Sequence, residues 1–142
     1  MSGKTTILFL CTHNASRSQM AEGYMRAKYG DQYDVFSAGT EPGAVSPMAI
    51  ESMNEIWIDI SYQRSKSIEE FTGKQIDTVV TLCDSARENC PFFPGMRRIM
   101  HESFTDPKDL TGTDEEIRTG FRLIRNELTR WIDTTFAAKK NR

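Results

Sequence analysis

Cysteine and histidine are scarce in this sequence, whose 142 residues include three cysteines and two histidines. An odd number of cysteines with no recognisable secretion signal argues against a framework of structural disulfide bonds. Two histidines are also too few for a usual zinc site, and Cys83 and Cys90 do not have zinc-ligand spacing. We therefore expect no bound metal, and we expect the thiols to take part in chemistry rather than in cross-links.

A long hydrophobic run and an excess of basic charge are also missing. The apolar stretch ILFL before Cys11 is far shorter than the roughly 20 residues of a membrane span, and no small-residue cleavage site follows it. The 18 basic and 20 acidic side chains nearly cancel, and no basic stripe alternates with aromatic residues. We therefore expect a cytoplasmic protein without a membrane or nucleic-acid partner, in which the basic segment KKNR (139–142) is a solvated tail.

Length and hydrophobic periodicity predict a single α/β domain over residues 1–142, which we expect to be monomeric. Four short strands are expected, at residues 5–10, 33–39, 77–83 and 97–104. Helices are expected between and after them, at residues 18–29, 46–56 and 67–71 and from residue 113 onward. Strands that alternate with helices fold into a three-layer α/β/α architecture with a four-stranded, mostly parallel sheet.

Local signals define one end of two of these helices. Gly30 follows Tyr29 at a position where a left-handed C-cap would end the first helix. Thr113 and Glu116 have the spacing of a capping box at the start of the last helix. Beyond Glu116, apolar residues recur every three or four positions and predict an amphipathic helix that covers the sheet: Ile117, Phe121, Ile124, Leu128 and Trp131.

The octapeptide CTHNASRS (11–18) joins the first predicted strand to the first predicted helix. A loop that leads into a helix N-terminus presents unpaired backbone N–H groups and the positive end of the helix dipole, so it can enclose a tetrahedral oxyanion. Arg17 adds a bidentate clamp for two of the oxygens. In this field we expect Cys11 to be a nucleophilic thiolate rather than a buried thiol that only packs. We interpret His13 as a loop-lining residue rather than a base or a metal ligand.

Two of the thiols are expected to share one crevice. Cys11 and Cys83 both lie at the carboxyl ends of predicted strands, where ligands of parallel sheets bind. Spacing alone would nevertheless allow Cys83 to be a core thiol and Cys90 to be a stray loop thiol. It would also allow Asp106 to be either a proton donor beside a bound anion or the first residue of an Asp-Pro turn.

The pattern Cys-x5-Arg-Ser after a strand resembles the low-molecular-weight tyrosine phosphatases and the related thioredoxin-coupled arsenate reductases. Segments between residue 5 and about residue 107 are similar to the reductases in order and spacing: CTHNASRSQMAEG, FSAGTEPGAVSPMAIE, IDIS, VVTLCDSARENCP and TDP. Gln19 stands where the phosphatases usually carry proline. Lys108 and Asp109 follow Asp-Pro, where the phosphatases usually carry tyrosines. The resemblance therefore favours the reductases.

This resemblance implies reduction of arsenate to arsenite, an activity that serves arsenic detoxification. It implies that Cys11 attacks arsenate, that Ser18 hydrogen-bonds the thiolate and that Asp106 protonates the departing oxygen. Phosphate or sulfate can occupy the same loop. The residues that would bind the oxyanion are Thr12, His13, Asn14, Ala15, Ser16, Arg17 and Ser18.

The resemblance also gives Cys83 and Cys90 a role, because reduction of arsenate requires two electrons. Cys83 would attack the cysteine–arsenic adduct and leave a Cys11–Cys83 disulfide, which Cys90 would exchange for a Cys83–Cys90 disulfide. Thioredoxin would reduce this last disulfide, and no tightly bound cofactor is implied. A helix over residues 83–90 would hold the two α-carbons about 10 Å apart, whereas a disulfide tolerates about 7 Å. We therefore expect this segment to unwind on oxidation.

Some members of this family hold a potassium ion with residues that match Asn14, Glu22 and Ser37, together with an aspartate. Lys66 stands at the position of that aspartate. We expect its ammonium group to replace the ion, so we predict no potassium.

Two other functions stay open at this point. Cys11, Arg17 and Asp106 alone would suffice for a phosphatase that acts on phosphotyrosine or on a small phosphate ester. A non-enzymatic redox or oxyanion sensor would use the Cys83 and Cys90 switch to alter a partner contact, and it would not need Asp106.

Overall fold

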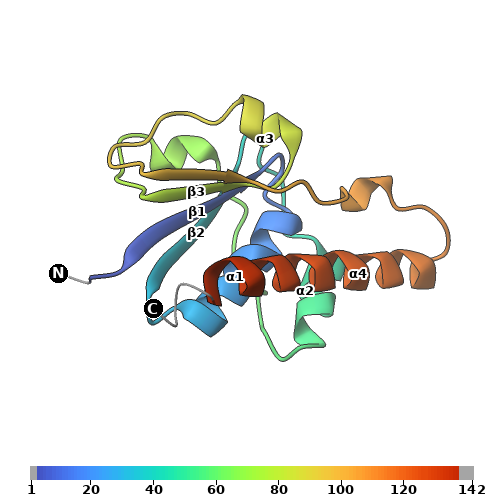
Figure 1. Ribbon diagram of the computed structural model, residues 1–142. Helices are drawn as coiled ribbons and strands as arrows, with labels where there is room; N and C mark the ends of the chain where they lie inside the picture. Colours follow the sequence, from blue (N-terminus) through green and yellow to red (C-terminus); the bar gives the residue numbers. More distant parts are fainter. Residues whose placement is uncertain (1–2, 138–142) are drawn as a thin grey trace.

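A computed structural model describes residues 3–137, and its centre is a four-stranded parallel sheet (Figure 1). The sheet has the spatial order β2-β1-β3-β4 and consists of β1 (Thr5–Cys11), β2 (Tyr33–Gly39), β3 (Thr78–Thr81) and β4 (Arg98–His101). The predicted α/β fold and four-stranded sheet are confirmed, although β3 and β4 are shorter than expected. The predicted tail KKNR lies outside the described residues.

Strand β1 is the buried centre of the sheet, because it pairs with β2 on one side and with β3 on the other. Its residues 7–10 are fully buried, as a continuous apolar run in a covered parallel sheet should be. All strands run in the same direction, so their carboxyl ends meet at one edge of the sheet. Cys11 and the residues that follow β3 therefore emerge at the same edge.

Helices form the outer layers of the molecule. One face of the sheet is covered by α1 (Arg17–Tyr29), α2 (Pro47–Asn54) and α4 (Asp114–Ile132), which contact one another. Figure 1 shows the short helix α3 (Asp84–Glu88) on the opposite side of the sheet. The predicted three-layer arrangement is confirmed.

The last helix, α4, begins and packs as its sequence predicts. The backbone N–H of Glu116 donates to Thr113 Oγ1 at 3.1 Å, and the Glu116 carboxylate accepts from the Thr113 backbone N–H at 3.0 Å, which completes the capping box. Phe121, Ile124 and Leu128 are buried beneath the helix. Their burial fixes α4 over α1 and α2.

The predicted end of the first helix is wrong in its geometry. Gly30 follows α1 but has φ −63° and ψ −16°, which is right-handed rather than left-handed backbone. A Cβ at this position would lie 2.3 Å from the carbonyl oxygen of Arg26. Close approach of the backbone, rather than a left-handed turn, therefore excludes a side chain here.

Within residues 3–137, none of the helices has both the length and the apolar composition that crossing a membrane requires.

Candidate active site

The segment 11–18 leaves the carboxyl end of β1 and turns directly into α1. The carbonyl oxygens of residues 11–16 all accept hydrogen bonds from groups around the loop, at 2.7–3.3 Å. By contrast, the backbone N–H groups of residues 12–16 donate to no other group in the described part of the chain. The loop therefore holds its carbonyls outward and leaves a row of N–H donors free for an anion, as the octapeptide predicts.

The thiol of Cys11 is buried at the base of this loop, 2.8 Å from the hydroxyl of Ser18. Asn14 Nδ2 donates to Ser18 Oγ at 2.7 Å and to Ser37 Oγ at 2.9 Å. Because Asn14 supplies a hydrogen to Ser18, the hydroxyl hydrogen of Ser18 is left to point at the Cys11 sulfur. This arrangement can stabilise a thiolate.

Arg17 and Asp106 line a pocket of about 320 Å³ together with Cys11. The buried guanidinium of Arg17 donates to the Phe104 carbonyl at 3.1 Å, and its Nη2 lies 3.5 Å from Asp106 Oδ2. Asp106 also accepts from the backbone N–H of Lys108 at 2.9 Å and so begins a short 3-10 turn. The two interpretations of Asp106 are therefore compatible, since the residue starts a turn and also lies in the pocket.

His13 lines the same pocket, and its Nδ1 donates to the carbonyl oxygen of Glu41 at 2.9 Å. This contact agrees with a loop-lining role. The pocket wall also contains Pro107 and Lys108, which follow Asp106, and three residues from distant segments that the sequence does not predict: Ser46, Pro47 and Phe121. They come from the start of α2 and from α4, and no local motif marks residues that only tertiary packing brings to a site.

Cys83 lies two residues beyond β3 and is joined to the loop by Thr12. Thr12 Oγ1 is 3.3 Å from Cys83 Sγ, and the Cys83 sulfur also accepts from the backbone N–H of Ala86 at 3.4 Å. Cys83 is thus the N-cap of α3, where its sulfur accepts a hydrogen bond from the first helical turn. Cys11 and Cys83 therefore emerge at the same edge of the sheet. The residues that line the pocket around Cys11 do not include Cys83, so a crevice shared by the two thiols stays a prediction.

Cys90 follows α3, and all three cysteines are free thiols. Its Sγ donates to the carbonyl of the next residue, Pro91, at 3.4 Å. Burial raises the pKa of the Cys90 thiol, so the protonated form is favoured in this conformation. The helix between the two cysteines, α3, is a single turn in this dithiol form. That the segment rearranges on oxidation stays a prediction.

Two residues outside the octapeptide hold the loop in its shape. Gln19 Nε2 donates to the backbone and side-chain oxygens of Asn14, at 3.0 and 2.9 Å, and to the Arg64 carbonyl at 2.9 Å. A Cβ on Gly39 would lie 2.6 Å from the Thr12 carbonyl oxygen and 2.8 Å from the Asn14 nitrogen. Glycine at position 39 therefore allows the loop to pack against β2. Of these two residues, the sequence pattern marks only Gln19, as a departure from the phosphatases.

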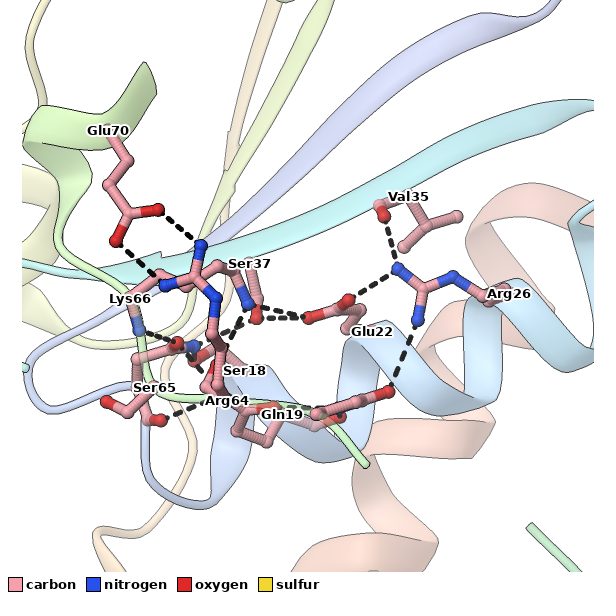
Figure 2. Close-up of polar contacts among 12 residues, drawn as sticks. Ser18, Gln19, Glu22, Arg26, Val35, Ser37, Arg64, Ser65, Lys66 and Glu70 are labelled. Carbon is pink, nitrogen blue, oxygen red and sulfur yellow. Dashed lines mark hydrogen bonds and ion pairs between the residues drawn. The ribbon is translucent and has the colours of Figure 1, made fainter. Parts of the chain in front are cut away.

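A buried ion pair lies behind the loop, where Figure 2 shows Lys66, Glu22 and Ser37 pointing toward one another. Lys66 Nζ is 3.5 Å from Glu22 Oε1 and donates to the Arg64 carbonyl at 3.0 Å. Ser37 donates to the same carboxylate at 2.5 Å, and Arg26 pairs with its other oxygen. Burial lowers the pKa of Lys66, while Glu22 opposes this by favouring the charged ammonium.

The Lys66 ammonium supplies a positive charge beside Glu22 and Ser37, so these residues do not fit a potassium ion. Among residues 3–137, no group of three or more histidine, cysteine, aspartate and glutamate side chains is arranged to hold a metal ion.

The chain is similar to known proteins over most of its length. Residues 6–136 match the family described as low molecular weight phosphotyrosine protein phosphatase. An arsenate reductase of Halalkalibacterium halodurans is 46% identical over 131 residues, which cover 92% of this chain and 94% of the relative. A solved arsenate reductase in a phosphate-binding state has a TM-score of 0.80 at 30% identity, covering 94% of this chain and 98% of that one. A thioredoxin-dependent arsenate reductase of Corynebacterium glutamicum has a TM-score of 0.65 at 26% identity, covering 94% of this chain and 64% of that one.

Proposed function

The chain belongs to the low molecular weight phosphotyrosine protein phosphatase family, and from this premise we propose that it reduces arsenate to arsenite through a relay of its three cysteines, with thioredoxin as the final reductant. The protein acts as one domain and needs no tightly bound cofactor. Its reducing electrons come from its own thiols, which thioredoxin restores.

The first step uses the loop, Arg17 and Asp106. The backbone N–H groups of residues 12–16 and the Arg17 guanidinium bind the oxygens of arsenate, and they would accept phosphate in the same way. The Cys11 thiolate, held by Ser18, attacks the arsenic atom. Asp106 gives its proton to the departing oxygen, which leaves as water, and a cysteine–arsenic bond remains.

The second step moves two electrons to arsenic. The Cys83 thiolate attacks Cys11 Sγ, a Cys11–Cys83 disulfide forms, and the electron pair of the sulfur–arsenic bond reduces arsenic to the arsenite level. Cys90 then loses its proton to solvent and attacks Cys83, which frees Cys11 as a thiolate and leaves a Cys83–Cys90 disulfide. Thioredoxin reduces this disulfide by the same exchange.

The contact between Thr12 and Cys83 is the observation that carries this proposal. A phosphatase needs one thiol, because water can release phosphate from it. Here a second buried thiol is hydrogen-bonded at 3.3 Å to the residue that follows the nucleophile. The same thiol is the N-cap of α3 and accepts a hydrogen bond from the backbone N–H of Ala86. These features support a redox reaction rather than hydrolysis.

Hydrolysis of a phosphate ester is the second candidate function, since Cys11, Arg17 and Asp106 line one pocket. Consumption of NADPH by thioredoxin and thioredoxin reductase, started by arsenate and then by phosphate, separates the two. We expect turnover with arsenate only, and we expect Cys83→Ser to abolish it while any hydrolysis of a phosphate ester survives. Hydrolysis without arsenate-dependent consumption of NADPH would instead identify a phosphatase with incidental cysteines.

A further inference from the structure

A small hydrogen-bonded cluster on the surface joins the cysteine-bearing helix to the sheet edge. Asp84, the first residue of α3, accepts from Ser103 Oγ at 3.0 Å, and the same Oδ1 lies 3.1 Å from His101 Nε2. His101 Nε2 is also 2.9 Å from Ser103 Oγ. Asp84 is therefore held by two side chains at once, and we call Asp84, His101 and Ser103 the latch cluster.

The two hydrogen-bond partners of Asp84 are themselves fixed by the sheet, whereas its ion-pair partner Arg87, with Nη2 at 3.8 Å from Asp84 Oδ1, lies on α3 itself. His101 is the last residue of β4, where it pairs with Thr81 of β3, and its Nδ1 lies 2.8 Å from Thr81 Oγ1. Ser103 lies between two residues tied to the end of β3, because the backbone N–H groups of Glu102 and Phe104 donate to the Thr81 and Leu82 carbonyls. The latch cluster therefore ties α3 to a rigid edge rather than to another loop.

The position of Asp84 links this cluster to the redox chemistry. Asp84 directly follows Cys83, and the only regular structure between Cys83 and Cys90 is the single turn of α3. The free thiols show that the latch cluster exists in the dithiol form. A helix over all of residues 83–90 would hold the two α-carbons about 10 Å apart, and α3 occupies residues 84–88 of this span. We therefore expect closure of the disulfide to unwind α3 and to carry Asp84 with it.

We propose that His101 and Ser103 are positioning residues that hold α3 in the dithiol conformation, so that the latch cluster sets the equilibrium between the Cys83–Cys90 dithiol and disulfide. This inference rests on the proposed cysteine relay. The hydrogen bonds of the latch cluster are present in the dithiol form and broken in the disulfide form, so they favour reduction of the disulfide by thioredoxin. The Ser103 hydroxyl, followed by Arg87 and His101, lowers the pKa of Asp84, which agrees with a carboxylate that accepts these bonds.

The latch cluster opposes the thiol–disulfide exchange that forms the Cys83–Cys90 bond. Cys90 loses a proton to solvent, its thiolate attacks Cys83 Sγ, a Cys83–Cys90 bond forms, and the Cys11–Cys83 bond breaks with its electron pair on Cys11. The later reduction by thioredoxin returns two electrons and two protons to Cys83 and Cys90, after which α3 and the latch cluster can re-form.

The test is the equilibrium of the full-length protein with thioredoxin at known dithiol-to-disulfide ratios. Acid quenching, alkylation and peptide mass spectrometry measure the fraction of chains that contain a Cys83–Cys90 disulfide. We expect His101→Gln and Ser103→Ala to raise the equilibrium constant for disulfide formation about threefold to tenfold, which is a fall of about 14–30 mV in reduction potential. Both substitutions lie outside residues 83–90, so they leave the helix propensity of α3 unchanged.

A double-substitution cycle identifies Asp84 as the target of both residues. In an Asp84→Asn background we expect the effect of His101→Gln to shrink to less than half, because its partner carboxylate is gone. Glu88→Gln makes the same charge change within α3 but outside the latch cluster, and it should leave the constant unaltered.

The outcomes separate the latch from the relay. A constant that stays the same in His101→Gln and Ser103→Ala, or that falls, overturns the latch while the relay stands. A substitution that only weakened the fold would destabilise the dithiol and disulfide forms equally. It would likewise leave the equilibrium constant for disulfide formation unchanged. If the unsubstituted protein forms no Cys83–Cys90 disulfide at any ratio, the relay and the latch both fail.

Discussion

Removal of the Thr12 hydroxyl should slow the second chemical step while leaving anion binding intact. Thr12→Val keeps the shape and the backbone N–H that serves the oxyanion, but it deletes the hydroxyl that lies 3.3 Å from Cys83 Sγ. A hydrogen bond to a charged acceptor contributes about 1.5–3 kcal/mol, which corresponds to a rate loss of about 10- to 150-fold when the thiolate is the attacking group.

The assay is a single turnover in which arsenite release is followed after excess arsenate is mixed with the reduced protein. Binding is measured separately, as the protection that arsenate gives Cys11 against alkylation. We expect slower release with unchanged protection. Thr40→Val is a matched control, because Thr40 donates its backbone N–H to the Cys11 carbonyl and its buried hydroxyl has no partner among residues 3–137.

Two results would refute the reasoning about Thr12. Arsenite release at the normal rate in Thr12→Val would show that the hydroxyl does not assist Cys83. Loss of protection in parallel with the rate would show that the substitution damages the oxyanion loop, and the slower release would then say nothing about the second thiol.

Two further predictions concern stability. Lys66→Met should lower the free energy of unfolding by about 1–3 kcal/mol in urea titrations, because Glu22 stays buried with one cation fewer. Arg64→Gln removes an exposed ion pair and should change the free energy of unfolding much less. Equal losses in the two variants would contradict this. Arg122 holds the pKa of Glu55 at about 2, below its usual value of 4.5. The stabilising effect of the Glu55 carboxylate is therefore present above pH 4.5 and is lost as the pH falls through 2. Glu55→Gln should be less stable than the parent at pH 7, and the difference should shrink steadily between pH 4.5 and pH 2. A constant difference across this range would exclude the interaction.

Much of the site could be predicted from local sequence, because its central part is local. The octapeptide, the strand before it and the helix after it are consecutive, so Cys11, Arg17 and Ser18 are fixed by one short stretch. The same locality makes the capping box of α4 and its buried stripe readable from spacing. The capping box and the buried stripe depend on neighbours within four residues along the chain, and the contact between Cys11 and Ser18 joins residues seven apart.

The parts that could not be predicted depend on contacts between distant segments. Pro47 and Phe121 reach the pocket from two different helices. The contact between Thr12 and Cys83 requires the exact register of β1 against β3. The geometry of Gly30 was predicted wrongly because a glycine after a helix usually marks a left-handed turn, whereas here the nearby Arg26 carbonyl excludes a side chain.

The most direct test of the cysteine relay is a single turnover of the Cys90→Ser variant with excess arsenate and no thioredoxin. The variant can form the Cys11–Cys83 disulfide but cannot resolve it. The relay predicts one arsenite released per chain, together with a Cys11–Cys83 disulfide in the peptide map. Release of arsenite without that disulfide, or no release at all, would contradict the account.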